Sequence, residues 1–357
     1  MATRSSDGPV LVLTTRTPHS GGDGTGLATL RFGPGTGALT ADANPPPVPA
    51  EGASFLAAHP SLDVVYSADE AESGTVSAFA HDGDGILTAL GTPVSSGGAN
   101  PCHLSVHPGG RWLLTANYGT ETAPGSVAVH RLDTDGRITE LTDVVVHEGS
   151  GPVTGRQEGS HAHQVITDPA GRFVLATDLG ADAVFTYRLD TDAGTLRQTA
   201  VNALRAGSGP RHLAFAPGGE LVWSVDELSS TLTGHRYDPG TGTLTAVSGV
   251  PATAAGPGIV NQPAGIVASP CGRFVWVTNR GADTVAAFRV TGTALEPIGE
   301  TPGGGTWPRG LTLASGYLLV ANQHSGTLAA LHIQDTGALD QPHPAAAVPS
   351  VTCALVL

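Results

Sequence analysis

Short apolar runs alternate with turns rich in Gly, Pro and Asp along the whole chain, and one pattern recurs. An apolar run is followed by a turn such as Pro-Gly-Gly or Pro-Ala-Gly and then by a second apolar run, as in 101–117, 160–178 and 210–226. Short runs bounded by turn residues are typical of β-strands, and no long apolar pattern with a helical period is visible. The pattern therefore predicts an all-β protein built from repeated hairpins.

A second marker counts the repeats independently. A Gly-containing turn followed by Leu or Ile opens a strand seven times, at intervals of 44 to 58 residues. The first strand of the repeat has its own marker, which occurs only six times. Four-stranded repeats of about 40–50 residues are typical of β-propellers, so we expect seven blades. The first set is Leu39, Leu87, Ile138, Leu196, Leu244, Leu295 and Leu339, and the second is Phe55, His103, Gln164, His212, Gly265 and Gly310.

The unequal counts predict how the ring closes. The N-terminal strand 10–15 would be the second strand of the last blade, and the C-terminal strand 351–356 would be its innermost strand. Such a blade, assembled from both ends of the chain, leaves no exposed sheet edge. We therefore expect one propeller domain over residues 10–357, preceded by a loose or disordered segment at residues 1–9.

The composition supports this fold and restricts the partners. The 357 residues include 49 Gly and 27 Pro but only 13% charged residues, which fits many turns and few exposed helices. The net charge is -14, and all 17 basic residues are arginine, so we expect binding to neither nucleic acid nor an anionic membrane. Three cysteines without paired spacing, together with the absence of an apolar signal core or spanning run, predict a soluble cytoplasmic protein whose oligomeric state stays open.

The candidate site follows from an alignment of the blades. Connections on one face of the ring are irregular, whereas turns on the other face are uniform. On the irregular face, the starts of the innermost strands place Ser54, Cys102, His163, Arg211, Ala264 and Arg309 in one equivalent position. The ends of the second strands add Glu227 and Arg280. We therefore expect one mouth of the ring to be surrounded, from four adjacent blades, by His163, Arg211, Glu227, Arg280 and Arg309.

These side chains have the chemistry of an acid–base site for an anion. A histidine can move protons near neutral pH. Two or three arginines can hold a carboxylate or phosphate, or stabilise a developing oxyanion. Glu227 can orient the histidine or pair with an arginine. The alternative is a purely structural ring of ion pairs among Arg211, Glu227 and Arg280.

Further candidates surround this set. The least regular segment, 146–160, carries Arg156 and Gln157, which we expect to fold over the mouth and bind substrate, because long loops in compact repeats are usually functional or disordered. His103 and His212 point from inner strands; they either contact substrate or satisfy backbone groups.

Two patterns have structural alternatives. His161 and His163 form an H-x-H pair that could bind a metal, but no Cys or carboxylate lies at ligand spacing, so we expect no metal and no cofactor. A short polar residue ends each second strand and is expected to cap the following turn rather than to act in the site. These residues include Asn117, Asp178, Asp226, Asn279 and Asn322.

Five segments together resemble the signature of a known family. They are Gly149-Ser150-Gly151-Pro152, Arg156-Gln157-Glu158-Gly159-Ser160-His161-Ala162-His163, Asp178-Leu179-Gly180-Ala181-Asp182, Gly207-Ser208-Gly209-Pro210-Arg211-His212 and Asp226-Glu227-Leu228-Ser229-Ser230. The family is the bacterial lactonase family, which includes propeller-type 6-phosphogluconolactonases and the fungal carboxy-cis,cis-muconate lactonising enzymes. The resemblance spans residues 10–357 and implies a seven-bladed propeller with a site on one face.

The resemblance also implies roles for residues of this chain. In the cyclising branch of the family a histidine, two arginines and a glutamate are proposed to act. They correspond to His163 or His161, to Arg211 and Arg280, and to Glu227. The chain departs from the family pattern at Asp226, where Asn is common, and at 153–155, which replaces an Asn-containing segment.

Three functions fit these observations. The first is a lactone hydrolase of carbohydrate metabolism that acts on a small anionic sugar lactone, as a 6-phosphogluconolactonase does. The second is a carboxymuconate-type cyclase or isomerase that acts on a small carboxylate, in aromatic breakdown or specialised metabolism. The third is a non-catalytic binding propeller, which would not need converging His, Glu and Arg side chains. The sequence favours the first.

Overall fold

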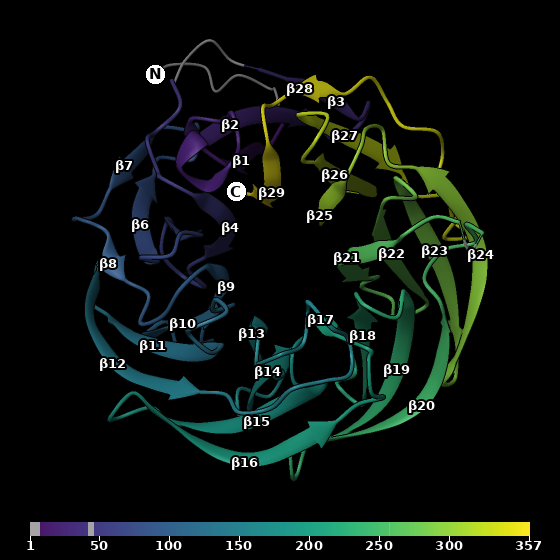
Figure 1. Ribbon diagram of the computed structural model, residues 1–357. Coiled ribbons are helices and arrows are strands. Elements are labelled where there is room, and N and C mark those ends of the chain that lie inside the picture. The colour runs from purple at the N-terminus through teal and green to yellow at the C-terminus, as the bar shows by residue number, and fades with distance from the viewer. Residues whose placement is uncertain (1–7, 42–45, 257) are drawn as a thin grey trace.

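Seven sheets surround a central axis in a computed structural model of the protein (Figure 1). The structure describes residues 8–41, 46–256 and 258–357. Each sheet contains a path of four antiparallel strands, and we number the sheets as blades 1 to 7. The predicted all-β fold with seven blades is confirmed. Of the segment 1–9 that we predicted to be loose, residues 1–7 lie outside the described residues.

The strands of each blade run in chain order from the axis outward, except in blade 7. Blade 1 contains β4 (Ala53–Ala58), β5 (Val64–Asp69), β6 (Thr75–His81) and β7 (Leu87–Ala89), with β8 (Val94–Ser95) also pairing with β6. Blade 2 contains β9 (Pro101–Val106), β10 (Trp112–Asn117), β11 (Ser126–Leu132) and β12 (Ile138–Val146). Blade 3 contains β13 (Ala162–Thr167), β14 (Val174–Asp178), β15 (Ala183–Asp190) and β16 (Thr195–Ala203).

The remaining blades follow the same plan. Blade 4 contains β17 (Pro210–Phe215), β18 (Leu221–Asp226), β19 (Thr231–Asp238) and β20 (Thr243–Pro251). Blade 5 contains β21 (Gln262–Ala268), β22 (Phe274–Arg280), β23 (Thr284–Thr291) and β24 (Ala294–Pro302). Blade 6 contains β25 (Pro308–Ala314), β26 (Tyr317–Asn322), β27 (Thr327–His332) and β28 (Ala346–Ala347). Blade 7 contains β29 (Val351–Val356), β1 (Val10–Thr15), β2 (Gly26–Gly33) and β3 (Ala38–Thr40).

The turn between the first two strands of a blade explains the recurrent Pro-Gly-Gly pattern. Gly110 and Gly219 have φ angles of 71° and 72°, in the left-handed region that glycine adopts without strain. The amide of Gly110 donates to the carbonyl of His107 at 2.8 Å, which closes the turn. These turns lie on the face opposite the irregular connections, so that face is uniform.

Blade 7 closes the ring as the unequal repeat counts predicted. β1 pairs with β2 on one side and with β29 on the other, and Val12 lies opposite Leu355 (Figure 1). The hydroxyl groups of Thr14 and Thr352 form a hydrogen bond of 2.9 Å between the two ends of the chain. No N-terminal edge therefore remains open beside the axis.

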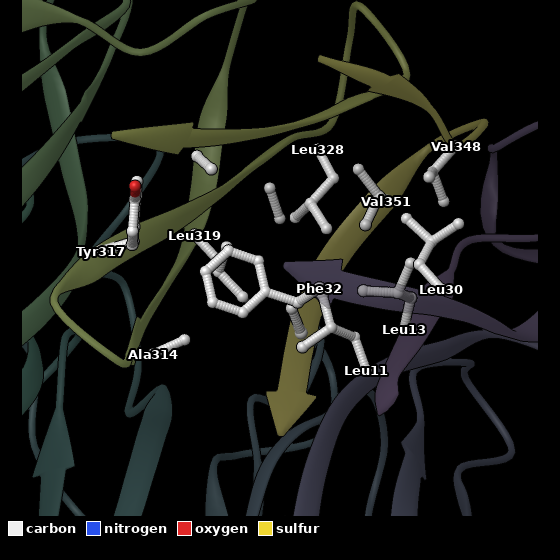
Figure 2. Packing of buried hydrophobic residues seen from close by; sticks show 13 residues of the cluster. Leu11, Leu13, Leu30, Phe32, Ala314, Tyr317, Leu319, Leu328, Val348 and Val351 are labelled. Carbon is white, nitrogen blue, oxygen red and sulfur yellow. The ribbon is translucent and has the colours of Figure 1, made fainter. Parts of the chain in front are cut away.

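Apolar side chains between neighbouring blades form the core. Figure 2 shows the cluster between blades 6 and 7, where Phe32 contacts Tyr317 edge to face at 5.5 Å between ring centroids. Trp276 is buried between blades 5 and 6, and its indole nitrogen donates to the carbonyl of Gly337 at 2.9 Å. Truncating a buried aromatic residue to alanine costs about 3–5 kcal/mol of unfolding free energy. These contacts make each blade depend on its neighbours.

Deletion of residues 350–357 should prevent folding or cause aggregation. The deletion removes β29, exposes the backbone of β1 as a free edge and uncovers Leu11 and Leu13, which are fully buried. Thermal melting and size-exclusion chromatography of the truncated protein check this expectation. A truncated protein that melts at the temperature of the full chain would contradict this role of β29.

Candidate active site

A β-bulge in the innermost strands directs side chains toward the axis. In blades 3, 4 and 6 the pairing register with the second strand shifts so that His163, Arg211 and Arg309 are each left without a partner residue. A bulge bends its strand and re-aims a side chain, and such bulges are common beside active sites. The register also shifts at the corresponding position of the other four blades, at Ser54, Cys102, Ala264–Gly265 and Thr352.

A second set of side chains comes from the ends of the second strands. Asp226, which ends β18, accepts hydrogen bonds from the hydroxyl groups of Ser224, Thr231 and Thr233 at 2.6–3.1 Å. In blade 5, the amide of Asn279 donates to the carbonyl of Ala252 at 2.8 Å. Asp226 thus joins the strands on both sides of the turn that follows it, as we expected, and Asn279 fixes the loop that follows β20.

In five of the seven blades, the residue that follows the short polar residue at the end of the second strand lies at the mouth of the ring. It is Arg16 in blade 7, Glu70 in blade 1, Tyr118 in blade 2, Glu227 in blade 4 and Arg280 in blade 5, and all five line one cavity. The anchored loops therefore fix the starting points of these side chains around the axis.

The cavity has a volume of about 450 Å³ and an unusual charge. Its lining includes five arginines and two glutamates, a balance of +3, although the whole chain carries -14. All five residues that we predicted around the mouth contribute to this lining, which confirms that they lie together. The arginines are Arg16, Arg156, Arg211, Arg280 and Arg309, the glutamates are Glu70 and Glu227, and the histidine is His163.

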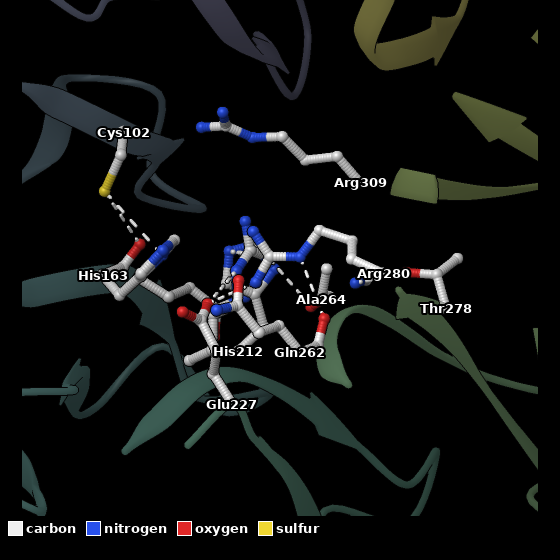
Figure 3. Close-up of polar contacts among 12 residues, drawn as sticks. Cys102, His163, His212, Glu227, Gln262, Ala264, Thr278, Arg280 and Arg309 are labelled. Carbon is white, nitrogen blue, oxygen red and sulfur yellow. Dashed lines mark hydrogen bonds and ion pairs between the residues drawn. The ribbon is translucent and has the colours of Figure 1, made fainter. Parts of the chain in front are cut away.

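Glu227 is the centre of the main charged cluster. Its carboxylate accepts hydrogen bonds from Arg280 and, at 2.5 Å, from Arg156, and it lies 3.4 Å from Nε of Arg211. Figure 3 shows the guanidinium group of Arg280 directed at Glu227. Burial alone would raise the pKa of Glu227, but Arg280 and Arg211 outweigh this effect and hold the pKa well below its usual range. Glu227 is therefore ionised at neutral pH and fixes three arginines.

Arg211 is held deep in the cavity. Its side chain is only 3% exposed, and one terminal nitrogen donates to the carbonyl of Ala264 at 2.8 Å. Its buried Nε faces the carboxylate of Glu227 at 3.4 Å. Burial, reinforced by Arg280, lowers the pKa of Arg211 to about 9, so the guanidinium group stays charged at pH 7. A buried cation held in a fixed position is suited to stabilising negative charge.

His163 is a buried, neutral base beside these arginines. Its ring contacts the rings of Tyr118 and His212 edge to face, and Nδ1 lies 3.8 Å from the sulfur of Cys102 (Figure 3). Burial and then the charge of Arg211 lower the pKa of His163 well below its usual value of 6.5. The imidazole is therefore unprotonated at neutral pH and able to accept a proton.

The structure separates the two histidines of the H-x-H pair. His161 stacks on Tyr118 with 4.3 Å between ring centroids, and its Nδ1 lies 3.0 Å from the carbonyl oxygen of Tyr118. It lines a neighbouring pocket of about 690 Å³ rather than the central cavity, which His163 lines. Within the described part of the chain, no cluster of three metal-ligating side chains forms. The geometry thus places His163, and not His161, beside Arg211 and Glu227.

His103 and His212 are buried in a row of rings with His163. They are 4% and 7% exposed, and each of the ring pairs His103–His212 and His212–His163 has 5.3 Å between centroids. Neither belongs to the lining of the central cavity, although His212 lines an adjoining smaller space of about 240 Å³. Of the two alternatives that we left open for these histidines, the lining of the central cavity thus gives no support to substrate contact.

Arg156 and Gln157 of the irregular loop have different positions and different contacts. Arg156 reaches over the mouth to Glu227, as we predicted. Gln157 does not: it is 1% exposed, and its amide nitrogen donates to the carbonyl of Leu179 and to the carboxylate of Asp182 at 2.7 and 2.8 Å. The prediction that Gln157 binds substrate is wrong, because its side chain is used to fix the loop against blade 3.

Two charged residues of the cavity were missed from the sequence. Arg16 and Glu70 occupy the positions in blades 7 and 1 that Glu227 occupies in blade 4. The alignment contained the signal for Glu70, which follows Asp69. Arg16 was harder to find, because the strand that precedes it belongs to the blade assembled from both ends of the chain.

Comparisons with known proteins agree with this site and fold. A family model described as "Lactonase, 7-bladed beta-propeller" matches residues 10–356. A 6-phosphogluconolactonase from Bacillus subtilis is 31% identical over 307 residues, which cover 84% of this chain and 86% of that protein. The periplasmic gluconolactonase of Pseudomonas aeruginosa superposes with a TM-score of 0.91 at 27% identity, covering 98% of this chain and 99% of the other. A protein from Lactobacillus plantarum gives a TM-score of 0.89 at 30% identity, with coverage of 98% and 99%.

The fold, the charged cavity and these comparisons together identify the class of protein. The chain belongs to the lactonase family of seven-bladed β-propellers, which makes it an enzyme of the lactone hydrolase class. No helix in the described ranges is long and apolar enough to cross a membrane.

Substitutions of Gln157 and Arg156 should affect different properties, stability in the first case and substrate binding in the second. Gln157→Ala should lower the unfolding free energy by about 1–3 kcal/mol, because it removes two buried hydrogen bonds, one of which satisfies the carbonyl of Leu179 and the other of which joins the loop to Asp182. Arg156→Ala should raise KM while the melting temperature stays within a few degrees, because Glu227 keeps Arg280. Melting curves and steady-state kinetics of both variants check this pair. Equal losses of stability in the two variants would contradict the assignment.

Proposed function

We propose that the enzyme hydrolyses a small anionic sugar lactone of the 6-phosphogluconolactone type. The observation that carries the proposal is the balance of +3 in a cavity of about 450 Å³ on a chain of charge -14. A positive cavity in an acidic protein concentrates a small anion at one place on the surface. Two relatives, from Bacillus subtilis and Formosa agariphila, are named 6-phosphogluconolactonase, which supports this choice of substrate.

His163 would act as the general base. It takes a proton from a water molecule, which attacks the lactone carbonyl carbon and forms a tetrahedral intermediate with a negatively charged oxygen. The bond between that carbon and the ring oxygen then breaks, and the protonated His163 returns the proton to the leaving oxygen. One water is consumed, and the product is an open-chain hydroxy acid. The low pKa of His163 keeps the base free at neutral pH.

Arg211 and Arg280 would stabilise the oxyanion. Their side chains are 3% and 9% exposed, so they lie in a region from which most water is excluded. Fixed donors in such a region need no reorganisation when charge develops, and removing one typically costs about 10²–10³ in kcat. Glu227 would keep both guanidinium groups oriented without itself contacting the reacting atoms.

The cysteines support a cytoplasmic location, which we propose as well. Cys102, Cys271 and Cys353 are all free thiols. Free thiols are typical of proteins in reducing compartments.

Turnover of three compounds tests the reaction. We expect hydrolysis of 6-phosphogluconolactone at the highest kcat/KM, slower hydrolysis of uncharged gluconolactone, and no conversion of carboxymuconate. Acid release followed in a pH-stat, with subtraction of spontaneous hydrolysis, measures the first two, and ultraviolet absorbance measures the third. Conversion of carboxymuconate alone would replace the hydrolase with a cyclase.

The pH dependence tests the role of His163. Because burial and Arg211 lower its pKa in the free enzyme, kcat/KM should stay constant from pH 8 down through 6.5 and fall only at lower pH. His163→Ala should lose about 10²–10⁴-fold in kcat. An acid limb centred at or above pH 6.5, or an unchanged profile in His163→Ala, would assign the base to another group.

Substitution of Arg211 tests the oxyanion role. Arg211→Lys keeps a positive charge but loses the planar fork, so it should lose about 10²–10³-fold in kcat, nearly as much as Arg211→Ala. Glu227 keeps Arg280 and Arg156 in both variants, so the fold should survive. Kinetics and thermal melting of the two variants decide the point. A fully active Arg211→Lys enzyme would mean that Arg211 only balances the charge of Glu227.

A further inference from the structure

A second charged cluster lies on the opposite side of the cavity from Glu227. Glu70 follows β5 in blade 1, Arg309 belongs to β25 in blade 6, and Arg16 follows β1 in blade 7. These three blades are neighbours in the ring and face blades 3 and 4 across the axis (Figure 1). The terminal nitrogen Nη2 of Arg309 donates to Glu70 at 2.7 Å, and that of Arg16 lies 3.6 Å from the other carboxylate oxygen.

Glu70 does not use all the hydrogen-bond donors of these two arginines. Glu70 holds one terminal nitrogen of each arginine, and two cations around one carboxylate leave a balance of +1. Among the described residues, the buried Nε of Arg16 has no hydrogen-bond partner, and Nη1 of Arg309 makes a long contact of 3.4 Å to the amide oxygen of Gln323. Burial would raise the pKa of Glu70, but Arg309 and Arg16 lower it, so the carboxylate remains ionised. The ionised carboxylate holds the guanidinium groups of both arginines in place. The cluster is therefore preorganised to bind a further anion.

The arginines at the two sides of the cavity differ in their exposure to water. The side chains of Arg309 and Arg16 are 12% and 21% exposed, whereas those of Arg211 and Arg280 are 3% and 9% exposed. A transition-state oxyanion gains most from donors in a dry site. A permanent dianion loses strong hydration when it is buried, so a wetter site near the mouth suits it better.

We propose that Arg309 and Arg16, positioned by Glu70, bind the remote phosphate group of a phosphorylated sugar lactone, while Arg211 and Arg280 face its carbonyl group. This inference rests on the proposed function and adds the residues that select the phosphorylated substrate. The planar guanidinium fork of Arg309 matches the geometry of phosphate oxygens. The substrate then lies across the axis, with its ends at opposite clusters.

The test compares two lactones that differ only in the phosphate. In Arg309→Gln, the ratio of kcat/KM for 6-phosphogluconolactone to that for gluconolactone should fall about 10- to 100-fold. In Arg156→Gln and Arg211→Gln, both values should fall together and the ratio should change little. Arg236→Gln, an exposed position on β19, is the matched surface control and should change neither value. Arg309→Lys keeps a cation beside Glu70 if Arg309→Gln folds poorly, and should lower the ratio in the same direction.

Binding of inorganic phosphate provides a readout without turnover. Calorimetry should show weaker phosphate binding in Arg309→Gln than in the wild type, by a factor of about 10 or more. An unchanged ratio together with unchanged phosphate binding would overturn the inference and leave the lactonase function intact. A ratio that collapses in Arg156→Gln instead would assign the phosphate to the loop and also overturn it. Failure of the wild type to hydrolyse either lactone would reject the proposed function, and phosphate binding would still decide between the two arginine clusters.

Discussion

The pairing of β29 with β1 is the constraint on which the rest of the molecule depends. A sheet that remained open at this point would leave a row of unpaired backbone groups, and the apolar layer between blades 6 and 7 would lose one of its walls. Because each blade packs only on its two neighbours, the angle between blades is fixed only when the circle is complete. The cavity at the axis has residues from all seven blades in its lining, so its shape is a property of the closed ring and of no single blade.

The charges at the axis form a balanced system rather than a set of independent ion pairs. Five guanidinium groups in a small space repel each other, and the carboxylates of Glu227 and Glu70 reduce this repulsion. Each carboxylate contacts more than one arginine, so the arrangement tolerates the loss of one contact better than an isolated pair would. Neutralising a buried carboxylate in such a system is costly, since removing one partner leaves uncompensated charges of the other sign. The remaining positive balance is what an anionic substrate can compensate.

The sequence predicted the fold and the residues that come together around Glu227, because both follow from the repeat. Aligning equivalent positions gives the height of a residue along the axis and its blade, which is enough to bring His163, Arg211 and Arg280 together. The alignment does not give the direction of a side chain within a loop or its depth below the mouth. Gln157 was therefore misassigned beside Arg156, and the sequence could not decide between substrate contact and a structural role for His103 and His212. The pairing of Glu70 with Arg309 and Arg16 joins three blades through long side chains, and no pattern along the chain contains that information.

The bulge at the start of every innermost strand separates the chemistry of the site from the stability of the fold. A bulged residue stands outside the regular ladder, so its identity can change without breaking the pairing on either side of it. In three blades this position holds Ser54, Ala264 and Thr352, whose small side chains leave room near the axis. The ring thus presents, in each blade, one position at which the side chain can vary. Evolution or design can exchange residues at these positions to reshape the binding space while the scaffold stays the same.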